Sequence, residues 1–504
     1  MKKFLPLLLT SLITFLAFPT LLFRQPLPSL GLLAWFSLVP LFIFFKDKTP
    51  RQVFWTSFIA GFLFYSGAFY WIYNALHYFG HLSPSASLGA LVVMMTAMTL
   101  YLAGALALAR WLSLKTGLSF YLLLPWTWVV QDFCLNYFPV GGFSWGALAY
   151  TQTKLLPMIQ IADLGGPYLV TFLIVLLNAS IARVLVREKG AWVQSLLVSV
   201  LLILTVGYGF YRILSYSEED RPHFQVSLLQ GNIPQEEKWQ ERRAQAILGI
   251  YQEMMDQVVA SDLVVWPEAS YPYLLSFPLR GSSGLGASFK FDTIVGAVTG
   301  QFTKKETISN SALLIKKGGE FAGAYHKLHL VPFGEYVPYQ TVLSFLHKVV
   351  PVIGEMKAGE DARLLKTEKA QLAPLICYED LFPEIARNFT KKGADLLVNI
   401  TNDAWYGVTS APIQHMELSR FRAIENRRYL IRSTNTGLSA IIDPLGRVVK
   451  KGRLFQREMM EGEVVLGGPT TFYTRHGDLF AWGAVVVVVI LGLISCFKNK
   501  ENKG

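Results

Sequence analysis

The sequence contains little charge for its length. Only 16 % of its 504 residues are Asp, Glu, Lys or Arg, and 52 % are hydrophobic, whereas a soluble domain usually carries about 25 % charged residues. Cysteine is also scarce, with three in the whole chain. The low charge and high hydrophobicity exclude a disordered or fibrous protein and argue against a chain that is soluble throughout.

The net charge of +11 is confined to particular parts of the chain. Residues 215–478 hold 30 Lys and Arg and 30 Asp and Glu, so this stretch is neutral. Residues 1–214 and 479–504 together hold 16 basic and 5 acidic residues. A basic surplus beside long apolar runs is typical of membrane topology. It also argues against nucleic acid as a partner, which a pI near 9.3 would otherwise suggest.

Eight apolar runs are candidates for membrane-spanning helices, which need about 20 residues each. They are residues 4–22, 30–45, 53–76, 88–109, 118–135, 164–182, 192–213 and 478–497. With the N-terminus inside, the inner loops would carry thirteen Lys and Arg and the outer loops two or three. This bias predicts cytoplasmic termini and places the large segment after the seventh run outside the cytoplasm, on the periplasmic face of a bacterial inner membrane.

Residues 215–475 have a different pattern, in which short β-rich runs alternate with helical stretches and no repeat or low-complexity tract occurs. This alternation predicts an α/β domain with a largely buried sheet. The expected strands are 224–229, 262–266, 293–298, 312–315, 373–376, 396–400 and 439–442, and the expected helices are 241–259 and 412–428.

Polar residues follow several of these expected strands. Glu268 follows the second expected strand, Cys377 follows the fifth and Asn402 follows the sixth. Ligand sites of α/β sheets gather beyond the carboxyl ends of strands. Any one of these residues alone is more often a cap or a turn residue, and a lone Cys377 is as readily an inert buried thiol. Three together favour a site.

A lysine also stands out, in the segment 325–338. A lysine among apolar residues is usually on the surface, but Lys327 lies between His326 and His329, with Glu335 downstream and Pro and Gly residues throughout. This pattern predicts a fixed loop with several ionisable groups. The histidines and cysteines show no metal-ligand spacing, so we expect no metal and no cofactor.

Three of these groups occur in an order that resembles a known superfamily. Trp266-Pro267-Glu268, then Lys327 with Glu335, then Cys377-Tyr378-Glu379 resemble the Glu-Lys-Cys order of the nitrilase, or carbon–nitrogen hydrolase, superfamily. These motifs and the eight apolar runs, taken together, resemble the apolipoprotein N-acyltransferase family, and the resemblance covers nearly the full length of the chain. Further matching stretches are 142–145, 164–168, 230–235 with Trp239, and 435–437.

The resemblance implies a fold and a domain organisation. We expect a polytopic α-helical membrane protein of about eight transmembrane helices with a nitrilase-like α-β-β-α sandwich domain on the periplasmic side. The expected domains are a seven-helix transmembrane domain at 1–214, a catalytic domain at 215–475 and a last transmembrane helix with a cytoplasmic tail at 476–504.

The chemistry of acyl transfer assigns roles to the matched residues, since it needs a nucleophile, a base and an oxyanion stabiliser. We expect Cys377 to be the nucleophile, Glu268 the base and Lys327 the positive charge that stabilises the thiolate and the oxyanion. Glu335 would either orient Lys327 or assist proton transfer, while Tyr378 and Glu379 would hold the nucleophile turn. Substrate-binding residues are expected at four further positions, namely Trp239, Phe333, Tyr336 and Asn402.

The resemblance also implies the substrates. A phospholipid, phosphatidylethanolamine in the typical case, would donate an acyl chain to Cys377, and the α-amine of an S-diacylglyceryl cysteine on an apolipoprotein would accept it. The enzyme would be a monomer. Apolar loops at 271–278 and 337–353, with Phe277, Leu343, Phe345 and Leu346, would either contact lipid or pack onto the domain, and the sequence favours neither.

Two other functions fit parts of the pattern. A membrane-tethered amidase or nitrilase would use the same three residues with water as the acceptor, although one helix is enough for a tether. A transporter with a periplasmic domain would need ionisable residues inside its spans. The candidates, Asp132 and Asp163, lie near span ends, which disfavours this second function.

Overall fold

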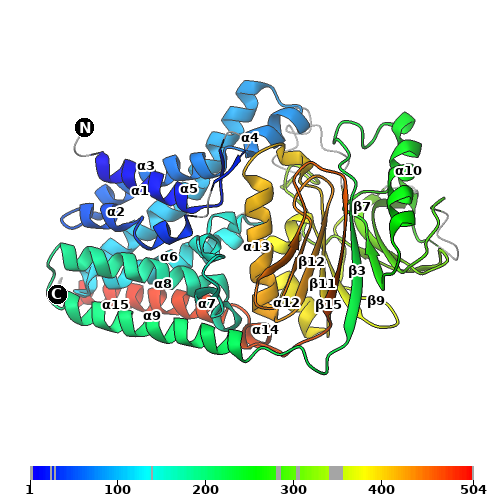
Figure 1. Cartoon of the computed structure of the whole chain (residues 1–504). Coiled ribbons are helices and arrows are strands. Elements are labelled where there is room, and N and C mark those ends of the chain that lie inside the picture. Colours follow the sequence, from blue (N-terminus) through cyan, green and yellow to red (C-terminus); the bar gives the residue numbers. More distant parts are fainter. Residues whose placement is uncertain are drawn as a thin grey trace. The chain divides into compact units, whose positions relative to one another are not determined.

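The computed structural model describes residues 4–22, 25–27, 30–137, 140–279, 285–301, 307–339 and 356–501 (Figure 1). Leu343, Phe345 and Leu346, for which we predicted lipid contact, lie outside the described residues. The chain divides into two compact units. The helical unit comprises Met1–Tyr73, Pro84–Tyr216 and His476–Gly504, and the α/β unit comprises Asn74–Ser83 and Ser217–Arg475.

Each of the eight apolar runs contains helix. The principal helices are α1 (Leu5–Ala17), α2 (Val39–Phe44), α3 (Pro50–Ala68), α4 (Ile72–Asn74), α5 (Pro84–Thr116), α6 (Phe120–Asn136), α7 (Leu156–Ile159), α8 (Ala162–Leu185), α9 (Ala191–Leu214) and α15 (Leu479–Glu501). By length and composition, four described helices can cross a membrane, namely α5, α8, α9 and α15, and a fifth span results if α3 and its continuation to Phe79, bent by 61°, count as one. The total of eight spans stays a prediction.

The helical unit combines tight contacts between helices with apolar side chains on its outside. A Cβ on Gly209 of α9 would lie 1.8 Å from the carbonyl oxygen of Pro157 in α7, so only glycine permits this contact. Trp192, Leu196 and Leu204 of the same helix are more than 60 % exposed. Small residues at helix contacts and large apolar residues facing outward are what a lipid environment favours.

The α/β unit contains two large sheets. The seven-stranded sheet has the order β15-β3-β4-β6-β7-β8 with β5 paired to β6, and the six-stranded sheet has the order β14-β13-β12-β11-β10-β9. The strands of the first are β3 (His223–Gln230), β4 (Leu263–Val265), β5 (Leu275–Ser276), β6 (Thr293–Gln301), β7 (Thr307–Ile315), β8 (Phe321–His326) and β15 (Glu458–Val465). Those of the second are β9 (Leu365–Lys366), β10 (Gln371–Ile376), β11 (Leu396–Thr401), β12 (Tyr429–Thr434), β13 (Ala440–Ile442) and β14 (Val448–Lys451).

Parallel pairing brings the carboxyl ends of the central strands to one edge of each sheet. β3, β4 and β6 are parallel neighbours, and β10, β11 and β12 are parallel neighbours in the other sheet. β11 is buried along its whole length, as is typical of a strand covered on both faces. The residues that follow β4, β10 and β11 are those for which the sequence predicted a site.

Helices cover the outer face of each sheet, so the unit has four layers in the order helix, sheet, sheet, helix. Figure 1 shows α10 (Glu241–Gln257) and α13 (Ala411–Asn426) on opposite sides of the two sheets, with α12 (Pro383–Lys391) beside α13. α10 packs Ile247, Tyr251 and Met254 into a core with Val264 and Val295 of the first sheet. This spacing of three and four residues is that of an amphipathic helix.

The two sheets contact each other through β12. The Ser433 hydroxyl in β12 lies 3.1 Å from the carbonyl oxygen of Leu229 in β3 and 3.0 Å from that of Val265 in β4. Thr434 donates to Gln230 Oε1 at 3.1 Å. These bonds fix the strand that carries Glu268 against the sheet that carries Cys377.

All seven expected strands and both expected helices are present, with ends that differ by a few residues. The strands β5, β8, β9, β12, β14 and β15 and the helix α12 were not expected from the sequence. The sequence analysis also treated residues 74–83 as part of the membrane region, whereas this segment lies in the α/β unit. There Asn74 Nδ2 lies 3.5 Å from the Tyr406 carbonyl oxygen, and the rings of Phe79 and Trp405 are 5.7 Å apart.

Replacement of Ser433 by alanine tests the contact between the sheets. Ser433→Ala removes the donor for two buried carbonyl oxygens, so we expect a loss of about 1–3 kcal/mol in the free energy of unfolding. Thermal unfolding of the full chain in detergent measures the change. Ser276→Ala, at an exposed position of β5, is the control, and equal melting temperatures for the two variants would contradict this role of Ser433.

Candidate active site

The turn after β10 holds Cys377 in a strained conformation. β10 ends at Ile376, and Cys377 begins a short 3-10 helix (Cys377–Leu381) with φ of +52°. A non-glycine residue rarely adopts this left-handed region, and such strain often marks a functional position. Cys377 is 6 % exposed. The fold therefore fixes the direction of a buried thiol at a strand end.

The Glu379 side chain, two residues after Cys377, stabilises this turn through hydrogen bonds. Its Oε2 accepts the Ile376 N–H at 2.7 Å, and its Oε1 accepts the Tyr325 hydroxyl and the Leu328 N–H, both at 2.7 Å. Burial raises the pKa of Glu379 to about 7, although these donors act to lower it. The structural role expected for Glu379 is thus supported by its contacts, which join β8 of one sheet to β10 of the other.

Lys327 lies between two carboxylates. It is the first residue after β8, where the sequence analysis expected a loop throughout, and it is 1 % exposed. Its Nζ is 2.9 Å from Glu335 Oε1 and 3.8 Å from Glu268 Oε1. Burial alone would lower the pKa of Lys327, but the charges of Glu335 and Glu268 raise it above its ordinary value. The ammonium form of Lys327 is therefore favoured in this buried position.

Glu268 has one carboxylate oxygen that is held and one that is not. Asn310 Nδ2 donates to Glu268 Oε1 at 2.7 Å and lies 3.2 Å from Glu335 Oε1, so it links the two acids. Within the part of the chain that the structure describes, the buried Glu268 Oε2 has no hydrogen-bond partner. A carboxylate oxygen in this state can accept a proton from a reacting group.

The backbone around Glu268 is fixed by a close contact between neighbouring strands. Ala269 has φ of +43°, and a Cβ on Gly296 of β6 would lie 2.1 Å from the Pro267 carbonyl oxygen and 2.8 Å from the Ala269 nitrogen. Glycine is needed for this approach. The Lys238 ammonium also donates to the Glu268 carbonyl oxygen, at 2.8 Å.

The Cys377 thiol is electrostatically coupled to the same groups. Burial raises the pKa of Cys377 well above its usual range, the Glu268 carboxylate raises it further, and the Lys327 ammonium lowers it. In the resting site the sulfur is thus a thiol, and it needs a base to become nucleophilic. The structure brings the predicted Glu268, Lys327 and Cys377 into one buried cluster together with Glu335 and Glu379.

The four residues predicted to bind substrate differ in their surroundings. Trp239 is 42 % exposed, and Phe333 and Tyr336 are partly buried next to each other, with the Phe333 N–H donating to the Tyr336 carbonyl oxygen at 2.8 Å. Asn402 is buried, donates to Gln235 Oε1 at 2.7 Å and accepts from Asn435 Nδ2 at 3.0 Å. These contacts give Asn402 a supporting role, and substrate binding by all four stays a prediction.

The loop at 271–278 was expected either to contact lipid or to pack onto the domain, and its residues differ in this respect. Phe277 packs against the core, with its ring 4.8 Å from that of His326. Tyr273 and Leu274 are 37 % and 45 % exposed. Phe277 therefore packs onto the domain, and the neighbouring side chains are the ones open to an external ligand.

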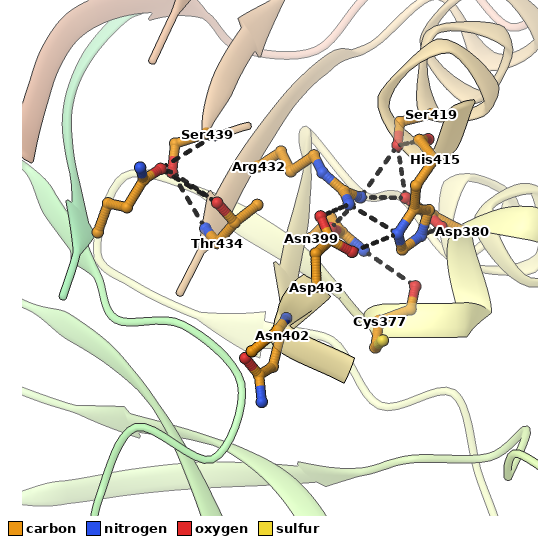
Figure 2. Close-up of polar contacts among 12 residues, drawn as sticks. Cys377, Asp380, Asn399, Asn402, Asp403, His415, Ser419, Arg432, Thr434 and Ser439 are labelled. Carbon is orange, nitrogen blue, oxygen red and sulfur yellow. Dashed lines mark hydrogen bonds and ion pairs between the residues drawn. The ribbon is translucent and has the colours of Figure 1, made fainter. Parts of the chain in front are cut away.

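A buried ionic cluster behind Cys377 was missed by the sequence analysis (Figure 2). It consists of Asp380, Asp403, His415 and Arg432, each 0 % exposed. Arg432 Nη1 is 2.8 Å from Asp380 Oδ2, and Nη2 is 3.0 Å from Asp403 Oδ2. Ser419 also donates to Asp380, at 2.5 Å. The four groups come from the turns after β10 and β11, from α13 and from β12.

His415 completes the charge balance of this cluster. Its Nε2 is 2.8 Å from Asp380 Oδ1 and its Nδ1 is 2.8 Å from Asp403 Oδ1, with Arg432 Nη2 also 2.8 Å from Nδ1. Burial and the Arg432 charge lower the pKa of His415, but the two carboxylates outweigh them and raise it above its ordinary value. The raised pKa favours the imidazolium form of His415, which together with the guanidinium balances the two carboxylates.

Asn399 connects the cluster to the nucleophile turn. Its Oδ1 accepts from Arg432 Nη1 at 2.8 Å, while its Nδ2 is 3.2 Å from the Leu375 carbonyl oxygen and 3.4 Å from that of Cys377 (Figure 2). The backbone of Cys377 is therefore supported from one side by Glu379 and from the other by Asn399. Among the described residues, no group of three or more His, Cys, Asp and Glu side chains could hold a metal ion.

The sheets, the four-layer order and the buried Glu, Lys and Cys at strand ends define a carbon–nitrogen hydrolase domain, and a family model described as "Carbon-nitrogen hydrolase" matches residues 225–469. A second model, "Apolipoprotein N-acyltransferase N-terminal domain", matches residues 10–180.

Comparison with curated proteins shows the family of the whole chain. An apolipoprotein N-acyltransferase of Geobacter metallireducens is 37 % identical over 99 % of this chain and 96 % of its own length. Those of Pseudomonas putida and Azotobacter vinelandii are 31 % and 32 % identical, each over 91 % of this chain, and 91 % and 89 % of their own lengths. The chain belongs to the apolipoprotein N-acyltransferase family, and it is an acyltransferase of lipoprotein maturation. The resemblance read from the sequence is confirmed.

Without Arg432, the buried carboxylates of Asp380 and Asp403 would keep His415 as their positive partner in the cluster. Arg432→Met should reduce the free energy of unfolding by about 3–5 kcal/mol, the usual cost of breaking a buried ion pair. Thermal or urea unfolding of the full chain measures it. Arg453→Met removes an arginine whose side chain is 70 % exposed and serves as the control. A loss below about 1 kcal/mol would contradict a cluster held by charge.

The raised pKa of His415 predicts a particular dependence of stability on pH. Its stabilising contribution is fully present below its unfolded pKa of about 6.5 and is lost as pH rises through the higher folded pKa. The difference in melting temperature between the wild type and His415→Asn should therefore be largest near pH 6 and shrink towards alkaline pH. A difference that stays constant or grows above pH 7 would contradict the imidazolium.

Proposed function

We propose that the chain transfers an acyl group from a phospholipid to the α-amine of an S-diacylglyceryl cysteine at the N-terminus of an apolipoprotein, through a thioester on Cys377. The observation that carries this proposal is the geometry of Glu268. One carboxylate oxygen is fixed by Asn310, and the other is buried and unpartnered among the described residues, in the same cluster as Lys327 and Cys377.

In the first half-reaction Glu268 accepts the Cys377 proton, and the sulfur attacks the ester carbonyl carbon of the donor. The resulting oxyanion is stabilised by the Lys327 ammonium and by the N–H of Tyr378, which follows the nucleophile in the turn. When the intermediate collapses, the carbon–oxygen bond of the ester breaks. The departing lysophospholipid oxygen takes the proton from Glu268, and the acyl group remains on sulfur.

In the second half-reaction the acceptor amine attacks the thioester carbonyl carbon. Glu268 accepts a proton from this amine, the carbon–sulfur bond breaks, and Cys377 regains a proton from Glu268. Glu335 keeps Lys327 in place through both steps, since its Oε1 is 2.9 Å from the ammonium. The scheme is ping-pong, with the phospholipid product released before the apolipoprotein reacts.

The apolar helices and the distribution of Lys and Arg support a particular orientation in a membrane. The helices α5, α8, α9 and α15 are apolar enough to span a bilayer, and both substrates carry lipid chains that keep them at a membrane. We propose eight spans, cytoplasmic termini and an α/β unit on the periplasmic side of a bacterial inner membrane, because the short loops with most Lys and Arg then lie in the cytoplasm.

Release of lysophospholipid tests the reaction class. The full chain in micelles that contain phosphatidylethanolamine should release about one lysophospholipid per protein and then stop. Addition of a synthetic diacylated lipopeptide with a free N-terminal cysteine amine should restart the release and yield a triacylated product. Steady release without the lipopeptide would instead show a hydrolase that uses water.

Replacement of the base tests the role of Glu268. Glu268→Gln keeps the size of the side chain and removes its ability to accept a proton, so acyl-enzyme formation should fall by about 10²- to 10⁴-fold. Glu253→Gln, at a side chain that is 66 % exposed, is the matched control and should keep the wild-type rate. Wild-type turnover by Glu268→Gln would remove Glu268 from this role.

A further inference from the structure

Lys238 is a buried ammonium at the active site for which the reaction scheme has no role. It lies in the loop between β3 and α10 and is 3 % exposed. Its Nζ donates to the carbonyl oxygen of Glu268, the proposed base, at 2.8 Å. Lysine is rarely buried to this extent unless it is paired. Packing alone therefore does not explain why a lysine is buried at position 238.

Hydrogen bonds fix the loop that carries Lys238, and they hold the ammonium in the site. The N–H of Asn232 donates to the Asn435 carbonyl oxygen at 2.9 Å, and that of Ile233 to Asn435 Oδ1 at 2.8 Å. Gln235 accepts from Asn402 at 2.7 Å. These bonds attach the loop to the turns after β11 and β12, and Asp403 in the first of these turns is electrostatically coupled to Cys377.

The hydrogen bonds of Lys238 are incomplete. An ammonium has three protons to donate, and within the described residues its one acceptor is the Glu268 carbonyl oxygen. Burial lowers the pKa of Lys238 to about 8, although the negative charges of Glu268 and Cys377 act to raise it. A buried cation that interacts with the base and the nucleophile, with donors to spare, is suited to support negative charge that appears during a reaction.

The charges of the site show what this cation contributes. With Cys377 as a thiol and Glu379 in the neutral form that burial favours, the carboxylates of Glu268 and Glu335 are balanced by the ammonium groups of Lys327 and Lys238. When Glu268 takes the thiol proton, the negative charge moves to sulfur, and the same two lysines still balance the site. Without Lys238 the site already carries one uncompensated negative charge while Cys377 is a thiol, so loss of the thiol proton would add negative charge to a buried environment in which it is costly.

We propose that Lys238 is a positioning residue of the acylation site, which holds the backbone of Glu268 through its carbonyl and supplies the second positive charge that stabilises the Cys377 thiolate. Among the described residues, the titratable groups that interact electrostatically with this pair include Glu268 after β4, Lys327 after β8, Tyr378 after β10, and Asp403 and Tyr406 after β11. The inference rests on the proposed function, in which the proton passes from Cys377 to Glu268 and the electron pair stays on sulfur.

Alkylation of Cys377 by iodoacetamide tests this role, because only the thiolate reacts and no lipid is needed. The full chain in detergent is treated at pH 7, and peptide mass spectrometry follows the adduct on Cys377 apart from those on Cys134 and Cys496. An opposite charge near a titrating group changes its pKa by about 1–3 units. We therefore expect Lys238→Met to slow alkylation at least tenfold and Lys238→Arg to stay within about threefold of the wild type.

A merely structural role gives a different result. If Lys238 only supported the loop, Lys238→Met would loosen the site, expose the buried thiol and speed its alkylation. Unchanged or faster alkylation of this variant would overturn the proposal. Lys369→Met, at a side chain that is 65 % exposed, is the control for the loss of a lysine charge and should react like the wild type.

The dependence on pH gives a second readout. As pH rises through about 8, the wild type loses the Lys238 charge, so its rate of acyl-enzyme formation from phosphatidylethanolamine should decline, whereas Lys238→Arg keeps its charge and should not show this decline. The same decline in both proteins would overturn the proposal. If the wild type formed no acyl-enzyme at all, the proposed function would fail while the alkylation result on Lys238 would still stand.

Discussion

The ion pair between Lys327 and Glu335, 2.9 Å long and almost completely buried, is the interaction on which the rest of the site depends. A buried ammonium is stable only with negative partners, and Lys327 has two of them, Glu335 at 2.9 Å and Glu268 at 3.8 Å. Asn310 therefore contacts both acids and fixes their separation. Because Lys327 follows β8 and Glu268 follows β4, the order of strands in one sheet determines the geometry of the base and the cation.

The nucleophile comes from the other sheet, so the contact between the sheets is part of the catalytic arrangement. Glu379 bonds to Tyr325 of β8 and to the backbone of Ile376 in β10, and Ser433 of β12 bonds to the backbone of β3 and β4. The strained backbone at Cys377 persists because surrounding bonds from Glu379 and Asn399 determine it on both sides. The ionic cluster around Arg432 then serves to hold Asn399 and the two acidic turns in register.

The sequence predicts the parts of this fold that follow simple patterns, and it fails where a buried polar group depends on a distant partner. The strands at 224–229 and 396–400 are mostly apolar and were predicted. β12 carries Arg432, Ser433 and Thr434, which are all buried. Its sequence looks too polar for a buried strand, because the two carboxylates that neutralise the arginine, Asp380 and Asp403, lie far away in the sequence. β8 was missed because it is half-exposed, ends at His326 and leads directly into Lys327.

The site itself is predicted in outline, because Glu268, Lys327 and Cys377 each follow a strand or a recognisable motif. His415 was set aside since it lacks metal-ligand spacing, yet its partners are carboxylates, and no local signal marks that role. Lys238 is adjacent to Trp239, which was singled out, but a lysine in a polar loop gives no sign of burial.

The central claim is that the acyl group passes through sulfur, and the intact mass of the purified protein tests it most directly. After incubation with phosphatidylethanolamine alone, the mass should increase by one acyl group, located on Cys377 by peptide mapping, and a diacylated lipopeptide should remove it. Transfer of acyl groups to the lipopeptide by a protein that never carries this adduct, or by Cys377→Ala, would contradict the account.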